Sequence, residues 1–302
     1  MSWIEESLAL LENDRHWGYR EGEAPACEPA ALAALALAAH KRGTTARRIG
    51  DWLVEQQATS GSVGVRHQDT DPHWPTGWAI LAWTLLASQA EPSPDERRLY
   101  RQPISRAVTW LLTMAGNPLP RTREMGHDMS LVGWPWVEGT HSWLEPTAIN
   151  VVALKANGEW QHPRVREGVK LIFDRLLPDG GCNYGNTTVF GQALRPHVQP
   201  SGLALLALAG ESAPPSDPRL DHTKEHVLTK LGPETTAASL GYGLLGLAAH
   251  DRFPEKAADW IATAAQRTRG RGADLPRLSV LLLAERGPAT PLVTLIRQGA
   301  PR

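Results

Sequence analysis

Acidic and polar residues stand directly before prolines that open several Ala- and Leu-rich segments of the chain. Glu28, Trp74, Glu145 and Gln199 each occupy this place. A carboxylate at a helix start is stabilised by the helix dipole and can cap exposed N–H groups, which explains each glutamate singly. If the helices form a ring, however, these side chains meet at one rim, where burial raises carboxyl pKa values into the range of acid catalysis. We therefore predict Glu28 and Glu145 as catalytic acids, with Trp74 and Gln199 as substrate-binding residues.

The segment GWPWVEGTHSWLEPTA, residues 133–148, is the densest group of aromatic and ionisable residues in the sequence. Its indole rings can stabilise a passing cation or stack on a sugar ring, so they suit an isoprenoid cavity and a carbohydrate site equally well. In a simpler interpretation, the tryptophans only plug the end of the fold and the histidine bonds to a loop carbonyl. The segment adds Glu138 as a catalytic candidate, and Trp134, Trp136, His141 and Trp143 as substrate-binding candidates.

Two further polar residues are expected at the same rim. Tyr184 lies in the loop CNYGN, and Arg195 precedes the apolar segment that begins at Val198. We predict both as substrate-binding residues, because a guanidinium can bind an anionic group such as diphosphate. A plain surface position is the alternative for Arg195.

The elements that must position these residues repeat along the chain. Mostly apolar segments alternate with segments that carry apolar residues at helical spacing beside Arg, Lys and Glu. This alternation recurs about six times and predicts an inner ring of buried helices wrapped by an outer ring of half-exposed helices. We therefore predict an all-α, single-domain chain over residues 1–302, an (α/α)6 toroid of six helical hairpins, with an open solenoid as the alternative. The apolar copies begin at Cys27, His73, Leu144, Val198, Pro233 and Asp274.

The loop LLPDGGCNYGN, residues 176–186, resembles the Asp-Gly-Gly-Trp signature of the prenyltransferase and squalene-cyclase repeat, with Cys182 in the place of the tryptophan. Weaker copies lie at residues 56–65 and 10–20. The resemblance covers nearly the whole chain and implies the α/α toroid that terpenoid cyclases and protein prenyltransferases share, here as a single barrel. It also implies an isoprenoid or other hydrophobic substrate, cyclised after protonation by an acid.

The catalytic motifs of that superfamily are incomplete in this chain. Cyclases use a D-x-D-D motif, whose nearest counterpart is residues 69–72, so Asp71 is the candidate proton donor; otherwise it forms a turn with Pro72. Prenyltransferases hold zinc with an Asp-x-Cys pair, but neither Cys27 nor Cys182 has an aspartate two residues earlier. We predict no metal ligand and no cofactor, and leave a zinc or magnesium ion open.

Composition excludes several classes of protein. The formal net charge is -1, so no general field attracts nucleic acid. The acidic start of the chain does not fit a signal peptide, and no apolar run reaches the ~18 residues of a membrane span. Two cysteines are too few for a disulfide framework. We expect a cytoplasmic protein with a hydrophobic small-molecule substrate, while peripheral membrane contact and a protein partner stay open.

Three functions follow from these observations. The first is isoprenoid chemistry of the terpene-cyclase or prenyltransferase kind. The second is a non-catalytic toroid that binds a lipid, a peptide or a partner protein. The third is a carbohydrate-active (α/α)6 enzyme with paired carboxylates. A deep cavity lined by tryptophan would favour the first, a filled ring centre the second, and an open groove with two carboxylates the third.

Overall fold

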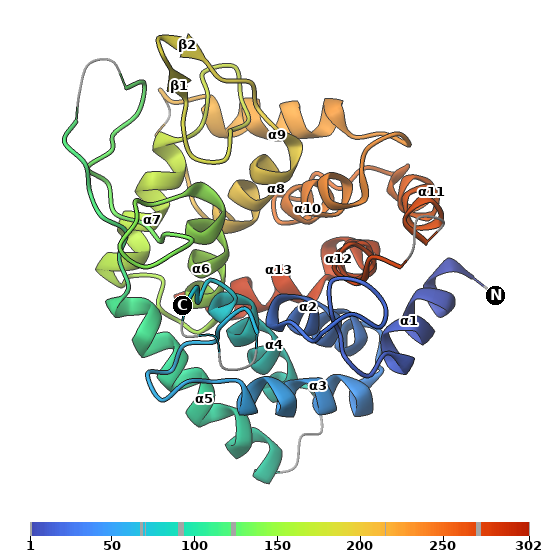
Figure 1. Ribbon diagram of the computed structural model, residues 1–302. Helices are drawn as coiled ribbons and strands as arrows, with labels where there is room; N and C mark the ends of the chain where they lie inside the picture. Colours follow the sequence, from blue (N-terminus) through green and yellow to red (C-terminus); the bar gives the residue numbers. More distant parts are fainter. Residues whose placement is uncertain are drawn as a thin grey trace.

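Within the residues that the computed structural model describes, six helices form a closed ring around the centre of the molecule (Figure 1). The described residues are 2–66, 69, 71–89, 94–121, 125–214, 216–269 and 273–301, with residues 94–98 described by their backbone only. Each inner helix contacts the next, and the last contacts the first, so the ring closes as an all-α toroid and not as an open solenoid. The inner helices are α2 (Cys27–Ala39), α4 (Thr76–Ser88), α6 (Leu144–Ala156), α8 (Val198–Ala207), α10 (Ala237–Ala248) and α12 (Leu275–Glu285).

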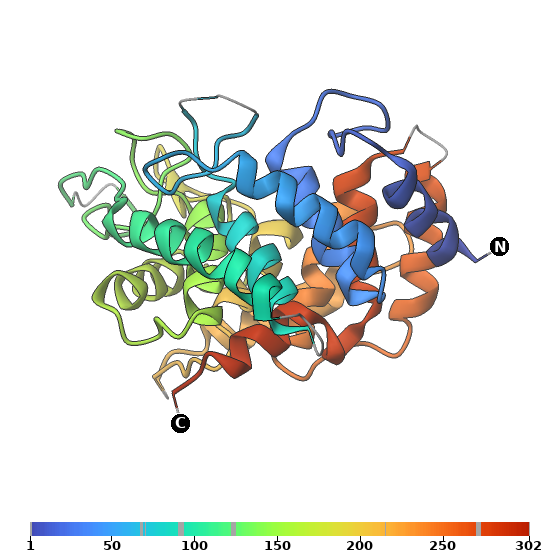
Figure 2. The ribbon, with the colours of Figure 1, turned by 90° about the horizontal axis from the view of Figure 1, so that it is seen from below.

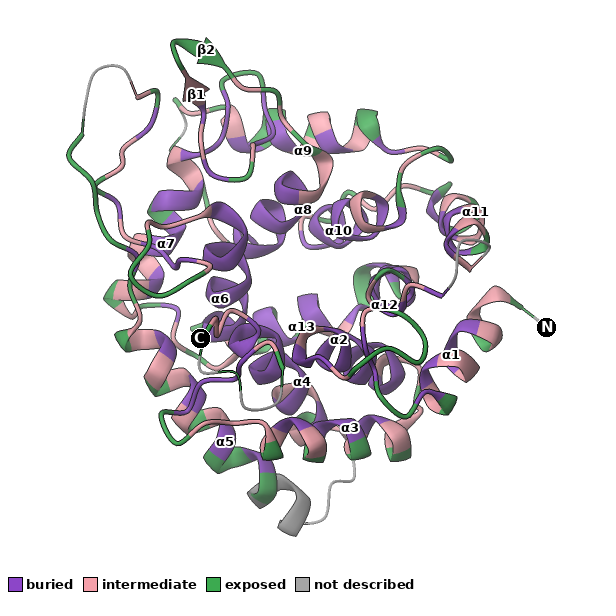
Figure 3. Ribbon diagram, in the orientation of Figure 1, coloured by how far each residue is buried: buried purple, intermediate pink, exposed green. Residues whose placement is uncertain are grey.

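A second set of helices wraps the ring, and the two sets differ in how they are buried (Figure 3). The inner helices are apolar on nearly every side because each is covered by two ring neighbours and by an outer helix. In α2, for example, every residue from Pro29 to Ala38 is buried. The outer helices bury only one face; α3 buries Ala46, Ile49 and Leu53, which recur at helical spacing. The outer helices are α1 (Trp3–Asn13), α3 (Gly43–Glu55), α5 (Pro94–Thr113), α7 (Pro163–Asp174), α9 (Arg219–Lys230) and α11 (Ala257–Arg269).

The two ends of the ring differ. A short 3-10 turn (Gly287–Ala289) leads into α13 (Pro291–Gln298), which contacts α4, α6 and α10 and buries four apolar residues, so it covers one end. Figure 2 shows α13 on the face opposite the loops that lead into α2 and α4. The other end carries the first turns of the inner helices, the long connections, and a hairpin of β1 (Thr188–Val189) and β2 (Gln192–Ala193), with Thr188 paired to Ala193. This second end is the one at which a ligand can enter.

None of the helices in the described part of the chain combines the length and the apolar character needed to cross a membrane.

Candidate functional site

The first turns of the inner helices bring several of the predicted residues to the open end of the ring. Glu28, Glu145 and Gln199 are each the second residue of their helix, and the proline that follows is the third, where a missing N–H has no intrahelical partner. Trp74 precedes the N-cap of α4, and Asp274 is the N-cap of α12. These five positions define the rim of the site.

Glu28 lies partly buried at the start of α2, and its Oε2 accepts a hydrogen bond of 3.0 Å from the Tyr19 hydroxyl. Burial, with smaller contributions from the negative charges of Glu145 and Asp274, raises the pKa of Glu28 from 4.5 to about 7. The hydrogen bond from Tyr19 acts in the opposite direction, because it favours the charged form. The carboxyl group of Glu28 is therefore close to half-protonated at neutral pH.

Glu145 is buried, with 8% of its surface exposed, and its Oε1 accepts a hydrogen bond of 3.0 Å from the Gln199 side-chain amide. Burial raises the pKa of Glu145, and the Gln199 hydrogen bond partly offsets this effect. Burial also raises the pKa of Tyr184, and the charge of Glu145 adds to that shift. Glu145, Gln199 and Tyr184 thus form one group on the α6 and α8 side of the rim.

A cavity of about 550 Å³ opens beside this group, and Tyr184 and Gln199 line it. Its walls come from the starts of α8, α10 and α12, the end of α11 and the loop before α2. Hydroxyl, amide, carboxylate and guanidinium groups make up most of the lining, which suits a ligand rich in hydroxyl groups better than a hydrocarbon. The polar lining residues beyond those already named are Arg20, Glu234, Thr236, Ser239, Arg267, Thr268, Asp274 and Arg277.

The centre of the ring is filled by two aromatic side chains. Trp78 of α4 and Tyr242 of α10 approach with ring centroids 6.2 Å apart, although the two helices are three positions apart in the ring. Both side chains are buried. Burial raises the pKa of Tyr242, and the charges of Glu28 and Glu145 raise it further, so Tyr242 lies within electrostatic reach of both glutamates. The two rings therefore close the centre of the toroid near both carboxyl groups.

The loop between α1 and α2 holds Tyr19 in place. Asp14 is buried and accepts hydrogen bonds from three backbone N–H groups within residues 16–22, at 2.6 to 3.1 Å. The carbonyl of Tyr19 accepts a hydrogen bond of 3.3 Å from the N–H of Leu275, and Arg20 pairs with Asp274 in an antiparallel bridge. This loop thus connects the start of α12 to the carboxyl group of Glu28.

Trp74 and Trp136 meet in a second place, with their rings edge to face and centroids 5.1 Å apart. Together with Asp71 and Glu138 they line a crevice of about 10 Å³. Asp71 lies 3.8 Å from the His73 imidazole, and Glu138 is exposed in its loop. Because about one water molecule fills such a volume, the crevice has no room for a substrate in this conformation.

The remaining predicted aromatic residues lie in the loop before α6. Trp134 is buried against the outer helices: its Nε1 donates to the carbonyl of Leu111 at 2.9 Å, and the Arg164 guanidinium lies 4.5 Å from its ring. His141 and Trp143 are half-buried, with ring centroids 4.8 Å apart. These contacts are those of packing, and they join the loop to α5 and α7.

Tyr184 and Arg195 flank the β-hairpin. The Tyr184 ring is 39% exposed and lies 5.4 Å from the His197 ring. Arg195 is exposed, and its carbonyl accepts a hydrogen bond of 2.8 Å from Asn183. The structure thus places Tyr184 in the cavity wall and Arg195 on the outer surface.

Neither cysteine is a reactive thiol. Cys27 and Cys182 are free and fully buried, and burial raises the pKa of each to about 12. Among the described residues, no three His, Cys, Asp or Glu side chains converge in a manner that could hold a metal ion.

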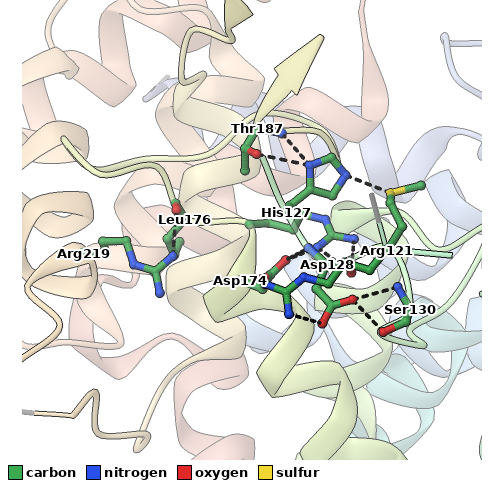
Figure 4. A network of polar contacts seen from close by, with 10 residues as sticks. Arg121, His127, Asp128, Ser130, Asp174, Leu176, Thr187 and Arg219 are labelled. Atoms are coloured by element: carbon green, nitrogen blue, oxygen red, sulfur yellow. Dashed lines mark hydrogen bonds and ion pairs between the residues drawn. The ribbon is translucent and has the colours of Figure 1, made fainter. Parts of the chain in front are cut away.

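A polar network outside the rim anchors the loop between α5 and α6 (Figure 4). The N–H of Asp128 donates to Asp174 at the end of α7, at 2.9 Å. The N–H of Thr187 donates to Nδ1 of His127, at 3.3 Å, which ties the same loop to the segment before β1. Burial, together with the charge of Arg175, lowers the pKa of His127 to about 4, so this imidazole is neutral at physiological pH. The network fixes the segment that carries the predicted tryptophans.

Several residues at or near the rim are absent from the sequence-based prediction. Tyr19 and Asp274 reach the site from a loop and a helix cap, and Trp78 and Tyr242 meet from opposite helices. The sequence signal for Tyr242 is a single aromatic ring within an otherwise aliphatic segment. Asp274 stands directly before Leu-Pro, which is a recognisable N-cap pattern.

Solved structures of similar fold include several glycosidases. A glycosidase variant with one glutamate replaced by alanine, in complex with glucose, is 14% identical with a TM-score of 0.57, over 97% of this chain and 96% of that one. The wild-type glycosidase is 13% identical with a TM-score of 0.55, over 99% and 97%. A protein from Actinoplanes is 15% identical with a TM-score of 0.53, over 90% and 81%. Comparisons with protein-family models and with curated proteins gave no match. At these identities the similarity shows the toroid fold alone.

Proposed function

We propose that this chain is a glycosidase in which Glu145 is the acid that protonates the leaving oxygen. The observation that carries the proposal is a buried carboxyl group of raised pKa beside a cavity lined mostly by polar side chains. A general acid must hold its proton near the working pH, and burial shifts the pKa of Glu145 in that direction. The Gln199 amide fixes one oxygen of Glu145 and so orients the carboxyl group.

The cavity wall supplies the contacts that a sugar needs. The hydroxyls of Thr236, Ser239 and Thr268 and the amide of Gln199 can exchange hydrogen bonds with sugar hydroxyls. The exposed part of the Tyr184 ring offers a face on which a pyranose can stack. In this proposal Glu28, held by Tyr19, binds a further hydroxyl group.

The named glycosidases of similar fold support the same function, and one of them is a complex with glucose. Because their sequence identity to this chain is low, they indicate which substrates to test first and do not show which substrate this chain uses. Glucosides are therefore the first probes.

The isoprenoid function implied by the resemblance requires an apolar cavity. The 550 Å³ cavity has a polar lining, and the crevice between Trp74 and Trp136 holds about one water molecule. Both observations favour a sugar over a polyprenyl chain. The Trp78 and Tyr242 rings that fill the centre of the ring favour a non-catalytic toroid, whereas the polar cavity beside Glu145 favours catalysis. A non-catalytic toroid would bind a ligand without converting it, and the same experiment distinguishes the two.

The test incubates the purified protein with 4-nitrophenyl α- and β-glucosides, a panel of gluco-oligosaccharides, squalene and polyprenyl diphosphates. Products are identified by mass spectrometry. We expect release of sugar or nitrophenol, and a fall in kcat on gluco-oligosaccharides of at least about 100-fold in Glu145→Gln, which keeps the contact with Gln199. The fall should be smaller on the nitrophenyl glucosides, because nitrophenolate leaves without a proton. The matched control is Glu255→Gln on the outer surface, where the residue is exposed and the rate should not change. Turnover of an isoprenoid, or full activity of Glu145→Gln on gluco-oligosaccharides, would refute the proposal.

A further inference from the structure

We infer that Asp274 is the second catalytic carboxylate of this site, the base that activates water on the side opposite Glu145. The inference rests on the proposed glycosidase function and adds the residue that such a reaction still lacks. Three features of Asp274 support this role: its position in the ring, its contacts, and its exposure.

Asp274 faces Glu145 across the rim. It is the N-cap of α12, and Glu145 lies in the first turn of α6; these helices are three positions apart in a closed ring of six, so they stand on opposite sides. Asp274 lines the cavity, and so does Gln199, the residue that holds Glu145. A ligand in the cavity can therefore contact Asp274 directly and lies beside the amide that holds Glu145.

The carboxylate of Asp274 is held in place by one residue. Its Oδ1 accepts the backbone N–H of Arg277 at 3.1 Å, and its Oδ2 lies 3.1 Å from the Arg277 guanidinium. The first contact is a hydrogen bond and the second is an ion pair, so both oxygens of the side chain have a partner. The antiparallel bridge to Arg20 fixes the backbone of Asp274 from the other side.

The two carboxyl groups have different surroundings. Burial raises the pKa of Glu145 and so favours its protonated form, an effect that the hydrogen bond from Gln199 partly offsets. The Asp274 side chain is 23% exposed and paired with the Arg277 guanidinium, so water can reach it. An acid and a base on facing walls is the arrangement used when water attacks the sugar directly.

The step balances with these groups alone. Asp274 takes a proton from a water molecule while the oxygen of that water molecule forms a bond to the anomeric carbon. The bond between that carbon and the glycosidic oxygen breaks, and the electron pair stays on the oxygen. This oxygen receives the proton of Glu145. Solvent then returns a proton to Glu145 and takes one from Asp274.

The test uses two variants that separate charge from helix capping. Asp274→Asn removes the charge but keeps an N-cap side chain, and Asp274→Ser keeps the cap while leaving space for a small anion. The control is Asp221→Asn on α9, where the carboxylate is 81% exposed and pairs only with Lys224 among the contacts described. Each protein is assayed with the glucoside that the wild type cleaves, with and without sodium azide, and its melting temperature is measured.

We expect kcat to fall at least about 100-fold in Asp274→Asn while KM and the melting temperature change little. Azide should restore turnover in Asp274→Ser and appear in the product as a glucosyl azide. Asp274→Asn with more than a tenth of wild-type kcat would overturn the inference, as would an inactive but folded Asp274→Ser that azide does not rescue. If the wild type cleaves no glucoside or oligosaccharide, the proposed function itself fails, which is a different result.

Discussion

Replacing Glu28 by glutamine measures how far the site perturbs a buried carboxyl group. The folded protein holds this proton up to a pH of about 7, whereas the unfolded chain releases it near 4.5. Between these values the folded state binds a proton that the unfolded state has lost. The contribution of Glu28 to the unfolding free energy is therefore fully present below pH 4.5 and is lost as the pH rises through 7. The separation of the two pKa values corresponds to about 3 kcal/mol of unfolding free energy.

Glutamine carries no charge but keeps an oxygen that can accept the hydrogen bond from Tyr19. We therefore expect Glu28→Gln to match the wild type in stability near pH 4.5 and to exceed it by up to about 3 kcal/mol at pH 8. Under the proposed function, in which Glu28 binds a sugar hydroxyl, the rise in stability should accompany a loss of substrate affinity.

The assay is urea unfolding of both proteins at pH 5 and pH 8. His127 and His250 complicate the absolute values, because burial lowers the pKa of each from 6.5 to about 4. Their contribution has the opposite sign, since stability then falls as the pH falls from 6.5 to 4. Both histidines are present in both proteins, so their effect cancels in the difference. Glu255→Gln, at an exposed position, should show no pH-dependent difference from the wild type. If the gap between Glu28→Gln and wild type is the same at both pH values, the reasoning about burial is refuted.

Two further predictions concern residues away from the rim. Lys155 is fully buried, donates to two carbonyls at the end of α8 and pairs with Glu211 at 2.8 Å. Lys155→Met should therefore lower the unfolding free energy by about 3 kcal/mol in urea titrations. A loss below about 1 kcal/mol would show that the pair contributes little to stability. Cys27 and Cys182 should not react with a disulfide reagent such as DTNB at pH 8 until the protein is unfolded. The reason is that each thiol is buried, with its pKa raised to about 12. Rapid labelling of the native protein would contradict this prediction.

Much of the fold could be predicted from the sequence because its determinants are local. The alternation of aliphatic and amphipathic segments sets which helices are covered on every side and which on one side only, and six such pairs suffice to close a ring. The position of Glu28, Glu145 and Gln199 before a proline also fixes them in a first turn, and therefore at one end of the ring. These conclusions require only the periodicity of a helix and the chemistry of its termini.

The sequence alone could not predict the contacts between elements that are far apart in the chain. The segment Thr290–Gln298 has the apolar spacing of an outer helix, yet α13 lies across the end of the ring, because only the assembled ring has an end to cover. Trp134 belongs to an aromatic-rich segment typical of a binding site, but α5 and α7 enclose it. Conversely, Tyr19 stands in unremarkable sequence and reaches the carboxyl group of Glu28 through the geometry of its loop. Helix-start patterns thus placed Glu28 and Glu145 at one end of the ring, but only the closure of the ring decided which carboxyl groups are buried there and which other residues join them.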